Sequence, residues 1–208
     1  HLGVARTTSR LLECFYWPCL RKIVANFICR CLTCEHFKPA KENTRAELHP
    51  ITSVRPWELI EIDFIKPLTE TNNNNKYILS VVDHFSKFAV AYATQKQDSR
   101  TVVDCLTKLF SEFGAPMRII SDQGRCFVSR EFLDFLKLWN IRKSTATSYH
   151  PQTSGLVERF NGTIIRILKR YVYETPETWD ISLPVATYAY NTTEQRTNQI
   201  SPYKVIDR

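Results

Sequence analysis

The sequence lacks long apolar segments, because no run of 18 apolar residues occurs anywhere in its 208 residues. A helix that crosses a lipid bilayer needs about 20 predominantly apolar residues, so we expect no membrane span and no membrane partner. No secretory signal starts the chain, and no internal repeat is present. The first residues fall inside a sequence motif, so we expect the chain to be a piece of a longer polyprotein.

The cysteines are unsuited to a disulfide scaffold. The chain holds seven cysteines, an odd number without even spacing, and five of them lie within residues 1–34. This distribution favours a reduced intracellular protein that binds metal near its N-terminus.

Acidic residues are outnumbered by basic ones. Lys and Arg total 28 against 21 Asp and Glu, which gives a net charge of +7 and a pI of about 9.1. The excess suits a polyanionic partner, although ordinary solubility charge would look the same. A hydrophobic content of 43% supports a real core, and the length suits one domain of ordinary size plus a small one.

Residues 1–36 show helical spacing of apolar residues, with Leu11, Leu12 and Phe15 in one piece and Ile23 and Phe27 in another. Pro18 separates the two pieces. Residues 38–56 are polar and hold three prolines, so this segment reads as a linker.

From Trp57 onward the pattern becomes mixed α/β. Strands are expected over 59–65, 77–82 and 88–92 as an antiparallel meander, followed by short strands at 118–121 and 142–145. Helices are expected from Asp98 or Ser99 to Phe113, over 131–139 with Ser129 as N-cap, from Pro151 to about Tyr173, and over 179–190 with a kink at Pro184.

Three acidic residues stand out from their surroundings. Asp63 lies in the apolar run 59–65, Asp122 follows the apolar run 117–120, and Glu158 opens the long helical pattern. There are 35 residues between Asp122 and Glu158 (158 − 122 − 1). A lone Asp after a strand is usually a turn former. Three carboxylates together can hold Mg²⁺, which prefers oxygen ligands, and two such ions suit the cutting and joining of nucleic-acid strands.

Five stretches resemble the integrase of gypsy-type LTR retrotransposons, which belongs to the retroviral integrase-like superfamily. They occur in the family's order and span nearly the whole chain: Phe15–Pro18 with Cys31–Cys34, Arg55–Phe64, Val82–Lys87, Ser121–Gly124 and Tyr149–Asn161. The resemblance implies a ribonuclease H-like catalytic core, a mixed sheet flanked by helices, after a small helical zinc-binding domain. It implies domains at 1–38 (truncated zinc-binding domain), 39–56 (linker), 57–195 (catalytic core) and 196–208 (start of a C-terminal extension).

The resemblance also implies a function. Asp63, Asp122 and Glu158 would form an Asp-Asp-Glu triad that holds Mg²⁺ or Mn²⁺. The reaction would be 3′-end processing and strand transfer of retrotransposon DNA into target DNA, by a homo-oligomer that reaches the nucleus after passage through the cytoplasm. Two alternatives stay open: a ribonuclease H-like nuclease without joining activity, and a decayed or domesticated copy that only binds nucleic acid.

Zinc binding is expected from Cys31 and Cys34, whose spacing is half of a zinc site. The family pairs such cysteines with two upstream histidines. His1 matches the second of these, and the first would precede the chain, so the site is incomplete as given. Cys29 and His36 are weaker candidates, because the family pattern does not use them.

The helix that carries Glu158 is expected to have a basic face. At about 100° per residue, Arg159, Arg166, Lys169 and Arg170 all project within about 120° of Glu158, and apolar residues fill the opposite arc. We interpret these four cations as phosphate contacts for DNA, although a solvated basic face would have the same pattern.

Two polar residues near Glu158 invite different interpretations. Asn161 lies one turn after Glu158 and is expected to orient a catalytic carboxylate, although a buried core amide is an alternative. His150 lies in the loop before the helix and is interpreted as structural or DNA-contacting. Relatives often carry a basic residue at the position of Gly162, where this chain departs from the family pattern and has no charge for DNA.

Overall fold

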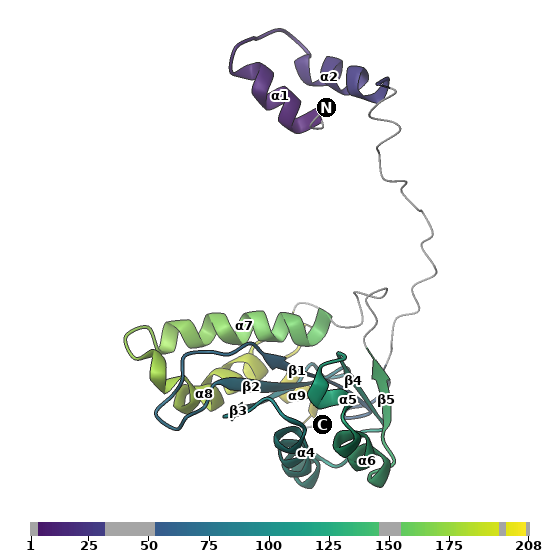
Figure 1. Cartoon of the computed structure of the whole chain (residues 1–208), viewed down its shortest axis with the longest axis vertical. Coiled ribbons are helices and arrows are strands. Elements are labelled where there is room, and N and C mark those ends of the chain that lie inside the picture. Colours follow the sequence, from purple (N-terminus) through teal and green to yellow (C-terminus); the bar gives the residue numbers. More distant parts are fainter. Residues whose placement is uncertain (1–3, 32–52, 146–154, 196–198, 207–208) are drawn as a thin grey trace. The chain divides into compact units, whose positions relative to one another are not determined.

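A computed structural model describes residues 4–31, 53–145, 155–195 and 199–206. The chain divides into two compact units, His1–Glu47 and Leu48–Arg208. Both are drawn in Figure 1, and each is described here by itself. In the described residues, no helix is long and apolar enough to cross a membrane.

The first unit holds two short helices, α1 (Val4–Leu12) and α2 (Leu20–Cys29). Their shared core is small: Leu20, Val24 and Ile28 are buried, and Val4 and Leu11 pack against them. The left-handed residue Cys19 begins α2 after the turn that contains Pro18. The expected helical pieces are therefore present on either side of this proline.

The second unit is built on a five-stranded sheet in the order β3-β2-β1-β4-β5. The strands are β1 (Leu59–Ile65), β2 (Tyr77–Asp83), β3 (Ala89–Thr94), β4 (Arg118–Ser121) and β5 (Arg142–Thr145). β1, β2 and β3 pair antiparallel, and β4 and β5 run parallel to β1. This mixed sheet with flanking helices is the expected architecture.

Alternation along β1 divides the core into two layers. Ile60, Ile62 and Phe64 join the cluster packed by α4, α5 and α6, whereas Ile65 joins the cluster packed by α7 and α8. Because side chains alternate along a strand, Glu61 and Asp63 share the face of Ile65. The helices accordingly flank the sheet in two groups (Figure 1).

The first group of helices is α4 (Ser99–Phe113), α5 (Arg125–Val128) and α6 (Arg130–Leu138). The Asp98 side chain caps α4 by accepting from the Thr101 amide, and Gly114 ends it with a φ of 83°. The Ser129 hydroxyl accepts from the Phe132 amide. Both expected caps are present, whereas the one-turn helix α5 was not expected, because its four residues are too few to show a period.

The second group is α7 (Gly155–Tyr171), the 3₁₀ turn η1 (Pro176–Thr178), α8 (Trp179–Thr192) and α9 (Pro202–Ile206). Pro184 lies inside α8. Asp180 of α8 accepts hydrogen bonds from Thr71, Asn73 and Asn75, so this helix holds the Asn-rich turn between β1 and β2.

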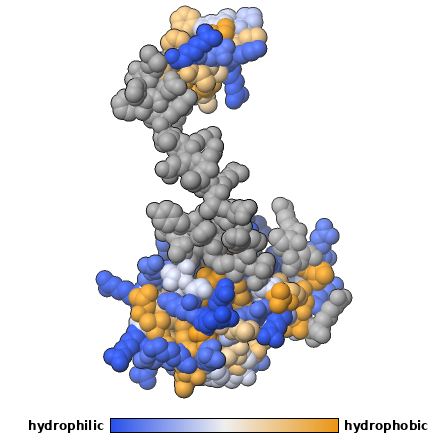
Figure 2. Space-filling view, turned by 90° about the vertical axis from the view of Figure 1, so that its right-hand side faces the viewer, coloured by the Kyte–Doolittle hydropathy of each residue, from blue (hydrophilic) through white to orange (hydrophobic). Residues whose placement is uncertain are grey.

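The segment expected as the start of a C-terminal extension contributes α9 to the second unit. Tyr203 of α9 packs its ring near those of Phe88 and Tyr188. The expected linker falls mostly outside the described residues, as does Pro151. Seen from the side, hydrophobic and hydrophilic residues are interspersed on the surface (Figure 2).

Candidate metal and nucleic-acid site

Asp63 lies near the end of the central strand β1, facing helix α7. Its carboxylate Oδ2 accepts a hydrogen bond of 3.0 Å from Nδ2 of Asn161. The Oδ1 atom of Asn161 is buried and has no hydrogen-bond partner among the residues that the structure describes. Asn161 is thus a partly buried amide that donates to the carboxylate of Asp63.

Asp122 follows β4, the strand parallel to β1. Its Oδ1 accepts from the Gly124 amide at 2.8 Å and so closes a tight turn. A Cβ atom on Gly124 would lie 2.9 Å from this same oxygen, so only glycine fits there without a shift. The turn-forming role expected of a lone aspartate is therefore present, and the exposed carboxylate also faces solvent.

Glu158 lies in the first turn of α7 and is exposed. Its negative charge helps to raise the pKa of Asp63. The pKa of Asp63 is raised to about 6, first by burial and then by the charges of Asp122, Glu61 and Glu158, while the Phe64 amide opposes the shift. The fold therefore gathers the three expected carboxylates into one electrostatic neighbourhood around Asp63.

The donors in this neighbourhood suit a hard divalent cation. Among the described residues, no group of three or more His, Cys, Asp or Glu side chains has the arrangement of a metal site. Mg²⁺ does not require such a group, because it usually keeps several waters and takes one or two carboxylates together with phosphates. Carboxylates that repel one another at a partly buried position gain stability from a cation, and that fits the raised pKa of Asp63.

The sequence did not single out Glu61, which is only 2% exposed. Its Oε2 lies 3.2 Å from Nε2 of His84 and 3.4 Å from the amide of Val157 in α7. An acidic residue two positions before Asp63 was the available signal, because alternation places both on one face.

The stretch Val82–Lys87 forms the tight turn between β2 and β3. Asp83 is fully buried and accepts from the Ser86 amide at 2.8 Å, from the Ser86 hydroxyl at 2.6 Å and from the Trp57 amide at 3.2 Å. These contacts make Asp83 a structural residue of the turn.

The four cations expected on α7 face different surroundings. Arg159 and Arg166 line a groove of about 1040 Å³ together with Lys87 and the end of α8. Arg159 lies close enough to Lys87 to lower the pKa of that amine, after burial, which is the larger cause. In the described part of the chain, no carboxylate forms a salt bridge with any of these three.

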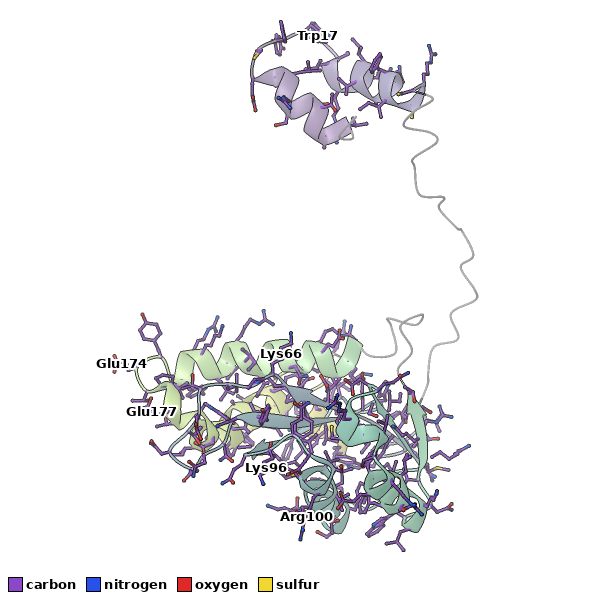
Figure 3. All side chains as sticks on the ribbon, in the orientation of Figure 1. Trp17, Lys66, Lys96, Arg100, Glu174 and Glu177 are labelled. Carbon is purple, nitrogen blue, oxygen red and sulfur yellow. The ribbon has the colours of Figure 1, made fainter. Side chains whose placement is uncertain are left out.

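Lys169 lies elsewhere, lining a smaller pocket with apolar residues that include Leu168 and Trp179. Arg170 is exposed and lines neither space. Glu174 and Glu177 follow at the C-terminal end of α7 (Figure 3). The groove is thus lined by only part of the expected basic face.

The expected zinc ligands are only partly within the described residues. His1 and Cys34 lie outside them, as does the weaker candidate His36, and so does His150 of the loop before α7. Cys29 is exposed at the end of α2, and Cys31 is partly buried just after it.

Comparison with known proteins agrees with this architecture. The profile of a family described as "Integrase core domain" matches residues 53–151, and that of a family described as "Integrase zinc binding domain" matches residues 1–40. The Tf2-3 transposon polyprotein of Schizosaccharomyces pombe is 30% identical over 213 residues, which cover 100% of this chain. The chain spans 16% of the length of that polyprotein.

Solved integrase structures share the fold. The catalytic core domain of HTLV-2 integrase in complex with magnesium (trimeric form) is 24% identical and covers 74% of this chain and 99% of its own, with a TM-score of 0.62. An intasome of simian T-cell lymphotropic virus, in complex with the B56 gamma subunit of PP2A, is 23% identical and covers 98% of this chain and 74% of its own, with a TM-score of 0.71. The chain therefore belongs to the integrases, in the group of gypsy-type LTR retrotransposons, with an integrase core domain preceded by an integrase zinc-binding domain.

Proposed function

We propose that this chain carries out DNA integration, through metal-dependent 3′-end processing and strand transfer of retrotransposon DNA into target DNA. One observation carries the proposal: in an integrase fold, burial and then the charges of Asp122, Glu61 and Glu158 raise the pKa of Asp63 on the central strand. In the first step, water attacks the phosphodiester near the 3′ end. In the second, the freed 3′-hydroxyl attacks a phosphodiester of the target, whose own 3′-oxygen leaves as a hydroxyl, so one strand is joined as another is cut and no covalent protein–DNA bond forms.

Asp63, Asp122 and Glu158 would hold Mg²⁺ or Mn²⁺. Such an ion, when bound, stabilises negative charge on the reacting phosphate oxygens. Asn161 keeps the Asp63 carboxylate oriented through its 3.0 Å hydrogen bond. The Asp122 turn fixes the second carboxylate at the end of β4.

DNA would run along the basic face of α7. Arg159 and Arg166 in the groove, with Lys87 opposite, form one part of the path, and Lys169 and Arg170 continue it. Cations without acidic partners are suited to phosphates, which bind by charge and release counterions. The partners are thus the ends of the retrotransposon DNA and the target DNA, and the chain acts as a homo-oligomer in the nucleus.

Given a fourth ligand, the first unit would bind Zn²⁺ through Cys31 and Cys34 with His1. Zinc takes four ligands in structural sites. Within the described helices of this unit the buried apolar cluster is small, consisting of Leu20, Val24 and Ile28, which supports a role for metal in folding.

The test is the set of substitutions Asp63→Asn, Asp122→Asn and Glu158→Gln, assayed for Mg²⁺-dependent strand transfer of pre-cut donor DNA. Each is expected to lose activity by about 1,000-fold or more, the scale of removing an electrostatic catalytic group, while the thermal melt stays intact. Asp134→Asn is the matched control, because Asp134 pairs only with exposed cations on α6.

Three outcomes would contradict the proposal. Cleavage without joined products indicates a nuclease. DNA binding without any metal-dependent cleavage indicates a decayed or domesticated copy. Wild-type activity in one of the three variants removes that residue from the site.

A further inference from the structure

Glu61 is a buried carboxylate that the proposed chemistry leaves unused. It is 2% exposed and lies on β1, on the same face as Asp63. Burying a charge is costly unless the group is paired and hydrogen-bonded. Its partners therefore indicate what it does for the fold.

The first partner is the start of helix α7. Oε2 of Glu61 accepts from the Val157 amide at 3.4 Å. The first four amides of a helix have no acceptor within the helix, and a negative charge is favoured near that end. Glu61 thus caps α7 from the neighbouring strand, at the residue directly before Glu158.

The second partner, His84, fixes Glu61 from the other side. Nε2 of His84 lies 3.2 Å from the same Oε2 atom, and the two side chains are only 10% and 2% exposed. His84 is itself held, because its amide donates to the Leu59 carbonyl at 2.9 Å and its carbonyl accepts from the Lys87 amine. The contact therefore joins β1, the β2–β3 turn and α7.

We propose that Glu61, held by His84, is a positioning residue that fixes the first turn of α7 and thereby sets Glu158 beside Asp63. The role of Glu158 in this inference rests on the proposed function. The placement of the turn does not, because it follows from the hydrogen bond to Val157. A buried polar contact that served stability alone would act on the whole core domain and would not single out this turn.

The experiment compares Glu61→Leu with Glu61→Gln in the full chain. Leucine fits the buried site but removes the acceptor, whereas glutamine keeps an oxygen that can accept from the Val157 amide. Glu58→Leu and Glu58→Gln are the matched controls, because Glu58 also accepts a backbone amide, that of Val54 at 2.9 Å, away from α7. Amide hydrogen exchange is measured residue by residue by NMR, without metal.

We expect the Val157 amide to exchange about tenfold faster in Glu61→Leu, the effect of losing one buried hydrogen bond. Amides of β2 and α4 should keep their wild-type rates, as should those of α7 in Glu61→Gln and in both Glu58 variants. Wild-type exchange at Val157 in Glu61→Leu would overturn the inference, and so would equally fast exchange in Glu61→Gln.

Strand-transfer kinetics give a second measurement. In Glu61→Leu, kcat should fall by about 10- to 100-fold with the KM for DNA unchanged, and Glu61→Gln should recover most of it. Equal loss in both variants would show that the charge of Glu61 acts on Asp63 directly, and would overturn the positioning role. An inactive wild-type chain would refute the proposed function alone, because the exchange measurement needs no catalysis.

Discussion

At the scale of single residues, Asp63 is the carboxylate of the candidate site whose pKa is clearly raised. Burial raises its pKa, and three neighbouring carboxylates raise it further, to about 6. Titratable groups perturbed by burial together with specific charges cluster at functional sites. The repulsion between Asp63 and its neighbouring carboxylates occurs at a position where a bound divalent cation would relieve it.

The raised pKa predicts how stability changes with pH in the absence of metal. The folded state keeps the Asp63 proton up to about pH 6, whereas the unfolded state releases it near the ordinary aspartate pKa of 3.8. The folded state thus binds more protons between these values, so the contribution of Asp63 to stability falls as pH rises through that window. Below it, both states are protonated and the cost is absent.

Asp63→Asn should therefore stabilise the metal-free chain at pH 7 and not at pH 4. The rise of the Asp63 pKa from 3.8 to about 6, at ~1.4 kcal/mol per pH unit, sets an upper limit of about 3 kcal/mol on this gain in the free energy of unfolding. The partial exposure of the side chain reduces the gain. Urea unfolding of both proteins in chelator at the two pH values measures this difference. Added Mg²⁺ should stabilise only the wild-type chain, and a difference independent of pH would contradict the prediction.

At the scale of elements, α7 has a buried side and an exposed side with different roles. Its buried side, which includes Leu156, Phe160 and Ile164, packs on the sheet. Its exposed side carries Glu158 in the first turn and cations along its length. Lys87 of the β2–β3 turn lines the groove beside α7, close enough to Arg159 that, after burial, this charge lowers the pKa of the Lys87 amine.

Removing one groove cation should weaken DNA binding whatever the sequence. Arg159→Ala, Arg166→Ala and Lys87→Gln should each lower the slope of log K against log salt by about 0.9, the value for one duplex phosphate contact. We expect the same change for Lys169→Ala and Arg170→Ala if the path continues along α7. DNA affinity measured from low to moderate salt gives the slopes.

Arg100→Ala is the matched control for these variants. Arg100 lies in the first turn of α4, away from α7 in the core domain (Figure 3). Its removal subtracts the same charge without a groove contact, so its slope should equal that of the wild type. Equal slopes in the control and in all groove variants would indicate a merely solvated face.

At the scale of the whole molecule, the two units differ in what stabilises them. The core domain has two large buried clusters, one on each face of the sheet. The first unit has three buried apolar residues among its described helices. A core of that size supplies little hydrophobic stabilisation, and small domains commonly depend on metal.

In a chain that carries a fourth zinc ligand, chelation should therefore unfold the first unit without unfolding the core domain. After zinc is loaded and then removed, amides of α1 and α2 should lose protection from hydrogen exchange, while those of β1 and β2 keep it. Cys31→Ser and Cys34→Ser should each prevent the zinc-dependent protection. Unchanged exchange in α1 and α2 after zinc removal would show that these helices fold without metal.

Most elements could be predicted because their signals are local. Apolar runs, the Asp98 and Ser129 caps and the Gly114 stop define strands and helices within a few residues of their observed bounds. The elements that were not expected, α5, η1 and α9, are three to five residues long. Segments that short carry no measurable period, and tertiary contacts such as those of Tyr203 hold them in place.

The sequence by itself determined the family, the identity of the three acidic residues and the basic character of α7, because these depend on residue type and spacing. Only the tertiary structure decided which groups meet. It placed Asn161 against Asp63 and set Glu61 between His84 and the start of α7. It also lined one groove with Lys87, Arg159 and Arg166, whereas Lys169 lines a different pocket. These contacts join residues distant in sequence, and their partners are set by strand order and helix packing, which local patterns do not encode.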